Sequence, residues 1–214
     1  TVYGNDGTDT AVAWEQQNNS VGAVFNGTSG DIDLSSDTSI DEIFIGGGHI
    51  STTFNAKSDG EATQGRVLSK AIWQIYLRDI SAGVVRVEFY HTFSGTNGQW
   101  QTTNTVVPIN ELTTITFIYN SDSISNSPVF IINGVKYTVG NGITAITSPT
   151  GTANVDLGSN ILIGNLVSDG ATFDGFIGDV KLSDVTRPSS EAITSYNAEK
   201  SDTDMTTVGD ENTQ

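Results

Sequence analysis

The feature that most constrains this chain is a predicted β-hairpin centred on Asn133-Gly134. Two runs rich in β-branched and aromatic residues, 129–132 and 135–139, meet at this dipeptide. Asn-Gly is the pair that most readily adopts positive φ at both centres of a type I′ turn, whose twist matches the flanking strands. The preceding run, 113–119, alternates in the way typical of a strand buried mainly on one face. The sequence therefore predicts neighbouring antiparallel strands at the centre of a β protein.

The composition favours many short strands over helices. The chain has 23 glycines together with abundant threonine, serine and asparagine, which suits strands joined by tight turns. Its 9 Phe, 6 Tyr and 3 Trp are enough for one sizeable core. A length of 214 residues is ordinary for a single all-β domain.

Five segments follow one another in an order found in a known family. They are VFNGTSGDIDL, GRVLSK, VFIINGVKYTV, ILIGN and FDGFIGDVKLSDVTRPSSEAI, and all lie within residues 21–198. In this order they resemble the laminin-G-like and concanavalin A-like jelly rolls of lectins and glucanases. The resemblance implies an all-β fold, a two-sheet antiparallel β-sandwich. The chain departs from the family at Phe54, where tryptophan is usual, and at Leu112, where an aromatic residue is usual.

The chain is predicted to have three parts. Residues 1–20 form a polar lead-in with an edge strand, and Trp14 within it is expected to plug the core or an interface. Residues 21–198 form the jelly roll and include one short C-terminal helix. This helix is expected at Pro188, because proline is favoured at the first helical position. Residues 199–214 form an acidic tail.

The net charge of −16 and the pI near 4.1 restrict the partners. Such a field repels phosphate backbones, so nucleic acid is not an expected partner, whereas cations such as Ca²⁺ are attracted. No run approaches the ~20 apolar residues of a membrane span, so membrane insertion is not expected. The absence of cysteine excludes disulfides and thiolate metal sites. It is also common in bacterial surface and virion proteins, and the expected location is extracellular, at a cell or virion surface.

A catalytic role is considered and set aside. Asp31 and Asp33 share a strand face about 6.6 Å apart, which is compatible with the paired carboxylates of glycoside hydrolases. The glucanases that this chain resembles carry an E-x-D-x-(x)-E run on one strand, and no such run occurs here. No Ser-His-Asp set, zinc spacing, phosphate loop or dinucleotide fingerprint is present. The chain is therefore predicted not to be an enzyme.

The best ligand candidate is Trp100 with Asn97 and Gln99, at a glycine-bearing turn. Sugar sites combine an aromatic ring, on which the apolar face of a sugar stacks, with amides that bond its hydroxyls. The alternative is that Trp100 is a sheet residue packed under a loop.

The run 84–90 predicts a strand with two different faces. Val85, Val87 and Phe89 are expected to face the core, whereas Arg86 and Glu88 are expected to mark a solvated face. The next residue, His91, has no nearby His, Cys or carboxylate cluster and is expected at the surface or at the strand end.

The family resemblance also implies one structural Ca²⁺. Its predicted ligands are Asp179 and the turn carbonyls of Asn26 and Gly27, because Ca²⁺ accepts one carboxylate together with carbonyls and waters. The alternative is that Asp179 caps a turn or faces solvent. The second acid usual in the family is replaced here by Val180.

Two functions remain open on the sequence. The first is a non-catalytic module for carbohydrate binding or adhesion, with a glycan as its partner. The second is a structural or assembly protein, such as a virion decoration or surface-layer component, in which the sandwich is a rigid brick that contacts neighbouring subunits. Exposed aromatics on one face favour the first function, and a large contact between chains favours an oligomer or larger assembly.

Overall fold

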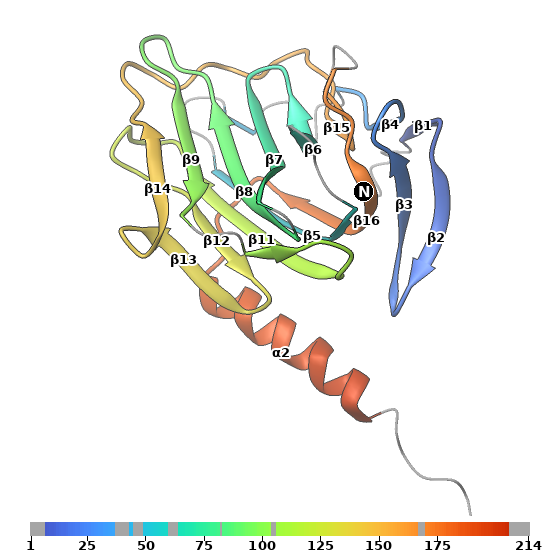
Figure 1. Ribbon diagram of the computed structural model, residues 1–214. Coiled ribbons are helices and arrows are strands. Elements are labelled where there is room, and N and C mark those ends of the chain that lie inside the picture. Colours follow the sequence, from blue (N-terminus) through green and yellow to red (C-terminus); the bar gives the residue numbers. More distant parts are fainter. Residues whose placement is uncertain are drawn as a thin grey trace, which may run out of the picture.

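The structure describes residues 7–36, 43–44, 49–59, 64–81, 83–103, 106–166 and 170–205. In the computed structural model their strands form one continuous sheet that folds over into two layers, sheet A in front of sheet B in Figure 1. Sheet A has the order β1 (Thr8–Thr10), β4 (Asp31–Asp33), β15 (Leu162–Ile163), β6 (Gly65–Lys70), β7 (Trp73–Ser81), β8 (Val84–His91), β9 (Gly98–Thr102), β14 (Gly142–Thr147), with β10 (Val107–Pro108) paired to β8. Sheet B has the order β13 (Val135–Val139), β12 (Val129–Ile132), β11 (Thr113–Asn120), β5 (His49–Ser58), β16 (Asp174–Ser183), β3 (Ser20–Asn26), β2 (Ala13–Gln17).

The two layers join through a short parallel pairing of β13 with β14, in which Thr138 lies opposite Gly142. Every other ladder between the described strands is antiparallel. The predicted two-sheet, all-β sandwich is therefore confirmed.

The central hairpin is also confirmed. Strands β12 and β13 meet at Asn133 and Gly134, whose φ values are 47° and 76°, as a type I′ turn requires. The turn is tied to β11, because the Asn133 amide donates to the Thr114 carbonyl and the Thr114 amide donates to Asn133 Oδ1. This positive-φ turn sets the register between β12 and β13.

Aromatic side chains from both layers fill the space between the sheets. Phe89 of sheet A lies 4.4 Å from Phe117 of sheet B and stacks on Trp100 at 5.7 Å, measured between ring centroids. Phe117 continues the cluster to Phe130 at 5.4 Å. All of these rings are buried, so they fix which face of each strand looks inward.

A buried ion pair lies at one end of this core. Lys70 Nζ lies 3.2 Å from Asp156 Oδ2, and neither side chain is exposed to solvent. The Trp73 indole donates to the same oxygen, and the Phe44 amide donates to Asp156 Oδ1. Asp156 therefore ties a segment without regular structure to β6 and β7.

His91 lies at the end of β8, as expected, but it is not at the surface. Its ring is fully buried, 4.5 Å from Phe44 and 4.9 Å from Phe93 between centroids. Burial lowers the pKa of His91 to about 4, so the imidazole is neutral near pH 7. The strand-end alternative is therefore correct and the surface alternative is wrong, because Phe44 and Tyr119, distant in sequence, cover this strand end.

The two ends of the described chain are more regular than predicted. The lead-in forms two strands, β1 and β2, which are the two edge strands of the described sheet. Trp14 on β2 is 59% exposed and does not plug the core. The helix α2 spans Ser189–Met205, so it starts after Pro188 as predicted but continues into the expected tail. Figure 1 shows that its far end extends away from the sandwich. The rest of that tail, 206–214, lies outside the described residues. No described helix has both the length and the apolar character needed to cross a membrane.

The hairpin turn provides a test of the fold. A Cβ at residue 134 would lie 2.7 Å from Tyr196 Cδ1 of α2, whereas a Cβ at Gly140, with φ of 82°, would meet nothing within 4 Å. Both Gly134→Ala and Gly140→Ala place alanine in the left-handed region, at roughly 1–2 kcal/mol each. We expect Gly134→Ala to lose more free energy of unfolding than Gly140→Ala in denaturant titrations. Adding Tyr196→Ala should recover the excess. Equal losses in the two single variants would show that α2 does not pack on the turn.

Candidate functional site

The outer face of sheet A carries a continuous layer of polar and aromatic side chains. It arises from alternation, because the neighbours of these residues along β7, β8 and β9 point into the core. We call it the polar face, and its residues are Arg66, Gln74, Tyr76, Arg78, Arg86, Glu88, Tyr90, Gln99 and Gln101.

Strand register arranges the polar face in three cross-strand rows. The first row is Gln74, Tyr90 and Gln99; the second is Arg66, Tyr76, Glu88 and Gln101; the third is Arg78 and Arg86. Neighbours within a row lie about 5 Å apart, and successive rows lie roughly 6.6 Å apart along the strands. The rows therefore form a grid of rings, amides and charges across four strands.

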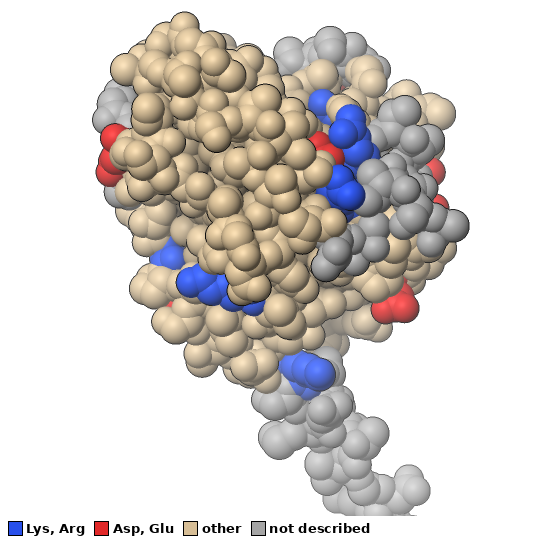
Figure 2. All heavy atoms as spheres, turned by 60° about the vertical axis from the view of Figure 1, so that its left-hand side comes forward, with Lys and Arg blue, Asp and Glu red and all other residues tan. Residues whose placement is uncertain are grey.

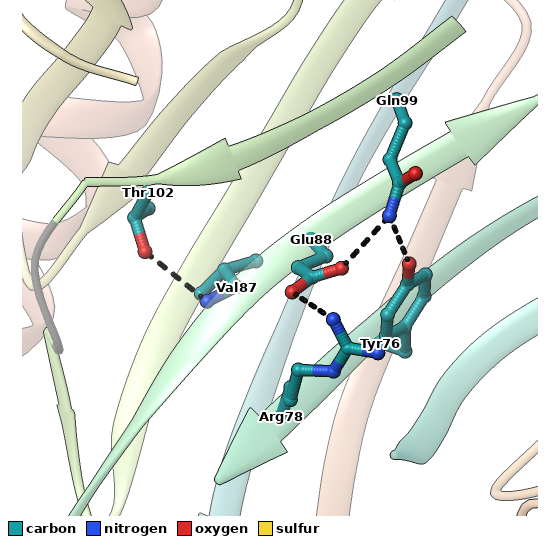
Figure 3. Close-up of polar contacts among 6 residues, drawn as sticks. All are labelled: Tyr76, Arg78, Val87, Glu88, Gln99 and Thr102. Carbon is teal, nitrogen blue, oxygen red and sulfur yellow. Dashed lines mark hydrogen bonds and ion pairs between the residues drawn. The ribbon is translucent and has the colours of Figure 1, made fainter. Parts of the chain in front are cut away.

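Glu88 lies at the centre of this grid and is fully buried (Figure 3). Arg78 Nη1 donates to Glu88 Oε1 at 3.3 Å, and Gln99 Nε2 donates to Glu88 Oε2 at 3.3 Å. The same Gln99 nitrogen lies 3.2 Å from the Tyr76 hydroxyl. Burial, together with the Glu88 carboxylate, raises the pKa of Tyr76, so its hydroxyl stays protonated. Both Glu88 oxygens thus hold neighbouring side chains in place.

The expectation that Arg86 and Glu88 mark a solvated face is corrected for Glu88. The two residues do share the outer face of β8, but Glu88 is 0% exposed and Arg86 is half-buried. Long side chains from the adjacent strands β7 and β9 cover the carboxylate. Alternation alone did not reveal this, because it says nothing of the neighbouring strands.

Arg66 covers another part of the polar face and is only 7% exposed. Its Nε donates to Gln74 Oε1 at 2.7 Å, and its Cζ lies 4.2 Å from the centroid of the Tyr76 ring. This cation–π contact holds the guanidinium over the face of the tyrosine ring. Burial lowers the pKa of Arg66, although the group remains a cation at neutral pH.

Two of the three predicted ligand residues border or lie on the polar face. Gln99 belongs to its first row, and Asn97 Nδ2 donates to the hydroxyl of Tyr90 in the same row at 2.6 Å. Trp100 does not: its indole is 1% exposed and points into the core, stacked on Phe89. The expectation of an exposed Trp100 is therefore corrected, and the alternative, a packed sheet residue, describes its position.

The sequence analysis missed Arg66, Gln74 and Tyr76. A usable signal was present, because Gln74, Tyr76 and Arg78 alternate with apolar residues along 73–78. Which strands lie beside this one depends on long-range pairing that the pattern does not contain.

The three residues predicted to bind calcium lie at two separate places. Asn26 pairs with Asp174, whereas Asp179 follows Gly178, which pairs with Gly22. Four residues of strand separate these points, about 13 Å. Asn26 Oδ1 accepts from the amides of Thr28 and Ser29, and Asp179 Oδ2 accepts from Asn55 Nδ2 at 3.0 Å. The predicted set therefore does not surround one ion.

The Asn26-Gly27 turn lies beside a different carboxylate. The side chain of Asp174 lies so close to Gly27 that a Cβ there would meet it at 3.0 Å. Burial raises the pKa of Asp174, and the neighbouring Asp59 carboxylate raises it further. Two nearby carboxylates thus share the end of β16.

A groove of about 500 Å³ lies on the outer side of sheet B, beside α2. Asn55, Thr114, Asp179 and Lys181 contribute polar groups to its lining, and Tyr196 contributes a ring. The groove lacks the ordered cross-strand rows of the polar face.

No family model matches the sequence, and no curated protein matches it. Solved structures do match. Domain 4 of an extracellular arabinanase from Geobacillus stearothermophilus, solved in complex with arabinotriose, is 15% identical, with a TM-score of 0.55 over 89% of this chain and 87% of that one. The fold is a concanavalin A-like jelly roll.

Two further jelly rolls agree. The binding domain of Paraclostridial Mosquitocidal Protein 1 is 15% identical with a TM-score of 0.64, over 92% of this chain and about half (48%) of that one. A heptameric SAP-like pentraxin from Limulus polyphemus is 12% identical with a TM-score of 0.52, over 69% of each chain. At these identities the likeness concerns the fold alone.

Proposed function

We propose that this chain is a non-catalytic module that binds a glycan on the polar face of sheet A, at a cell or virion surface. The observation that carries this proposal is the ring of Tyr90 among the amides of Gln74, Gln99 and Gln101. Tyr76 is only 3% exposed and positions Gln99 through its hydroxyl. Tyrosine rings stack on the apolar face of a sugar, and amides bond its hydroxyls. The half-buried positions of Tyr90 and the three glutamines leave part of each side chain accessible.

The preorganisation of the polar face supports the same function. Glu88 holds Arg78 and Gln99 in place, and Arg66 lies over the ring of Tyr76. Side chains that are already ordered lose little conformational entropy when a ligand binds. Weak individual contacts to hydroxyls therefore retain more of their free energy here than on a disordered surface.

The similar structures support a binding role. The arabinanase domain was solved with arabinotriose, and the mosquitocidal protein domain is named a binding domain. The arabinanase is also described as extracellular, which agrees with the proposed location.

A hydrolytic role receives less support. Glycoside hydrolysis by the common mechanisms uses two carboxyl groups that flank the scissile bond. The polar face has one carboxyl group, that of Glu88, and both of its oxygens already accept hydrogen bonds from neighbouring side chains. Asp33, one of the two aspartates considered for catalysis, accepts from the Ser35 amide and from Asn160 Nδ2. Its position is that of a turn-stabilising residue.

Assembly is the second candidate function. It is favoured by the edge strand β2, where Trp14 and, on the adjacent strand, Val21 are each 59% exposed. Exposed apolar side chains at a sheet edge suit a contact with a neighbouring subunit. This surface belongs to sheet B and is separate from the polar face.

The glycan proposal is tested by a glycan array with the full 214-residue chain, followed by titration of any ligand found. We expect Gln101→Ala and Tyr90→Ala each to weaken binding about tenfold or more, equivalent to ~1.4 kcal/mol. Trp14→Ala, which removes an exposed ring from the other sheet, should leave affinity unchanged. Equal affinity in all three variants would place the ligand elsewhere. If the chain binds no glycan on the array, the result would contradict the proposal and favour assembly.

The calcium expectation stays a proposal, with Asp174 in place of Asp179 as the carboxylate beside the turn carbonyls of Asn26 and Gly27. Ca²⁺ would relieve the repulsion between Asp174 and Asp59 and stabilise the fold by linkage. We expect Ca²⁺ to raise the melting temperature by about 2–4 °C for each kcal/mol of linkage, and excess EDTA to reverse it. Asp174→Asn should abolish the shift and Asp179→Ala should preserve it. If Ca²⁺ does not shift the melting temperature of the wild type, the proposal of a bound ion is wrong. If it shifts the melting temperature of Asp174→Asn equally, the ion does not bind at Asp174.

A further inference from the structure

The polar face is strongly basic within an acidic protein. The whole chain has 9 Lys and Arg residues and a net charge of −16, yet three of its arginines lie on this one face. They are accompanied there by a single carboxylate, that of Glu88. Figure 2 shows basic side chains gathered around an acidic one on this side of the molecule.

Two of the three arginines lack a carboxylate partner among the described residues. Glu88 pairs with Arg78, and its other oxygen accepts from Gln99. Arg66 Nη1 and Arg86 Nε are both buried, and neither has a hydrogen-bond partner in the part of the chain that the structure describes. Buried donors without acceptors are rare in folded proteins and cost free energy.

The register adds a second cost. Arg78 and Arg86 lie directly opposite each other on β7 and β8. Like charges at opposite positions destabilise a sheet. Folding alone does not require this arrangement, since any uncharged polar residue would suit the outer face of β8.

We propose that the ligand of the polar face is an acidic glycan, whose carboxylate or sulfate group is held by Arg66 and Arg86 beside Arg78. This inference rests on the proposed glycan-binding function and adds the charge of the ligand. A planar guanidinium donates two parallel hydrogen bonds to such an anion, and a charge-assisted bond is about twice as strong as a neutral one. Arg66 Nη1 and Arg86 Nε are covered by protein atoms in the unbound chain, so an anion bonds them only if those atoms move on binding.

The rest of the chain limits which anions can bind. Its large negative charge opposes an extended polyanion such as nucleic acid. A short glycan with its charged group over the arginines avoids most of that field, which falls off within about 10 Å at 0.1 M ionic strength. Its neutral part would lie on Tyr90 and on the glutamines of the first two rows.

The test uses matched pairs of oligosaccharides with the full chain. Oligogalacturonate, which carries only carboxylates, is compared with its methyl ester, and a carrageenan fragment, which carries only sulfates, is compared with its desulfated form. An array of acidic and neutral glycans extends the comparison to other sugars. We expect binding to one or more acidic members and a clear loss with the neutral partner; the preferred pair identifies carboxylate or sulfate as the group bound.

Arginine variants locate the charged group. Arg86→Gln and Arg66→Gln should each weaken binding of the acidic ligand about tenfold to a hundredfold, the range for losing a charge-assisted hydrogen bond. For Arg86→Gln, affinity for the neutral counterpart should change far less; Arg66→Gln also removes the hydrogen bond to Gln74 and is not used for that comparison. Arg187→Gln is the control, because Arg187 is paired with Glu191 on α2, away from this face. Melting temperatures confirm that each variant is folded, and Arg86→Gln alone suffices if Arg66→Gln does not fold.

Two outcomes overturn the proposal in different ways. If only neutral glycans bind and Tyr90→Ala abolishes their binding, the acidic ligand is wrong but the glycan-binding function stands. If no glycan of either kind binds, the proposed function fails as well. Acidic ligands that bind equally to Arg86→Gln and Arg187→Gln would also contradict the assignment of the charged group.

Discussion

The contact of Phe89 with Phe117, across the space between the two sheets, determines what the rest of sheet A presents to solvent. Phe89 also stacks on Trp100 of the adjacent strand, and all three rings are buried. Because side chains alternate along a strand, an inward Phe89 forces Glu88 and Tyr90 outward. An inward Trp100 likewise places Gln99 and Gln101 on the outer face. The aromatic core and the polar face are thus two consequences of one register.

The sequence predicted the fold well because the fold depends on local signals. Asn133-Gly134 requires positive φ at both positions, and the alternation around it requires strands, whatever lies beside them. The site was harder to predict, because it depends on which strands become neighbours. Glu88 looked solvated until Arg78 and Gln99 were placed on either side of it. Trp100 showed the same ambiguity: in Gln99-Trp100-Gln101 the alternation is plain, but only the opposite sheet decides which member faces inward.

The chain as a whole is acidic, whereas its polar face carries three arginines, and these opposite charges have different consequences. A high net charge keeps a protein soluble and repels other acidic molecules. Under the proposed function, the small basic area within that field would recognise a ligand that places its own charge directly on the arginines. Buried, unsatisfied donors such as Arg66 Nη1 persist at such a face at a cost in stability, as strained or unpaired groups often do at functional sites. The buried pair of Lys70 and Asp156 differs, because each charge there has its partner and the pair ties a segment without regular structure to the sheet.

The central claim is that ligand contacts lie on the outer face of β7, β8 and β9. It is tested most directly by following the backbone amide resonances of the full chain in two-dimensional NMR spectra during titration with a glycan that binds. The account predicts the largest shift changes within 74–78, 86–90 and 99–101, with smaller changes elsewhere. Shift changes concentrated along β2, or in the groove beside α2 that Tyr196 lines, would contradict it.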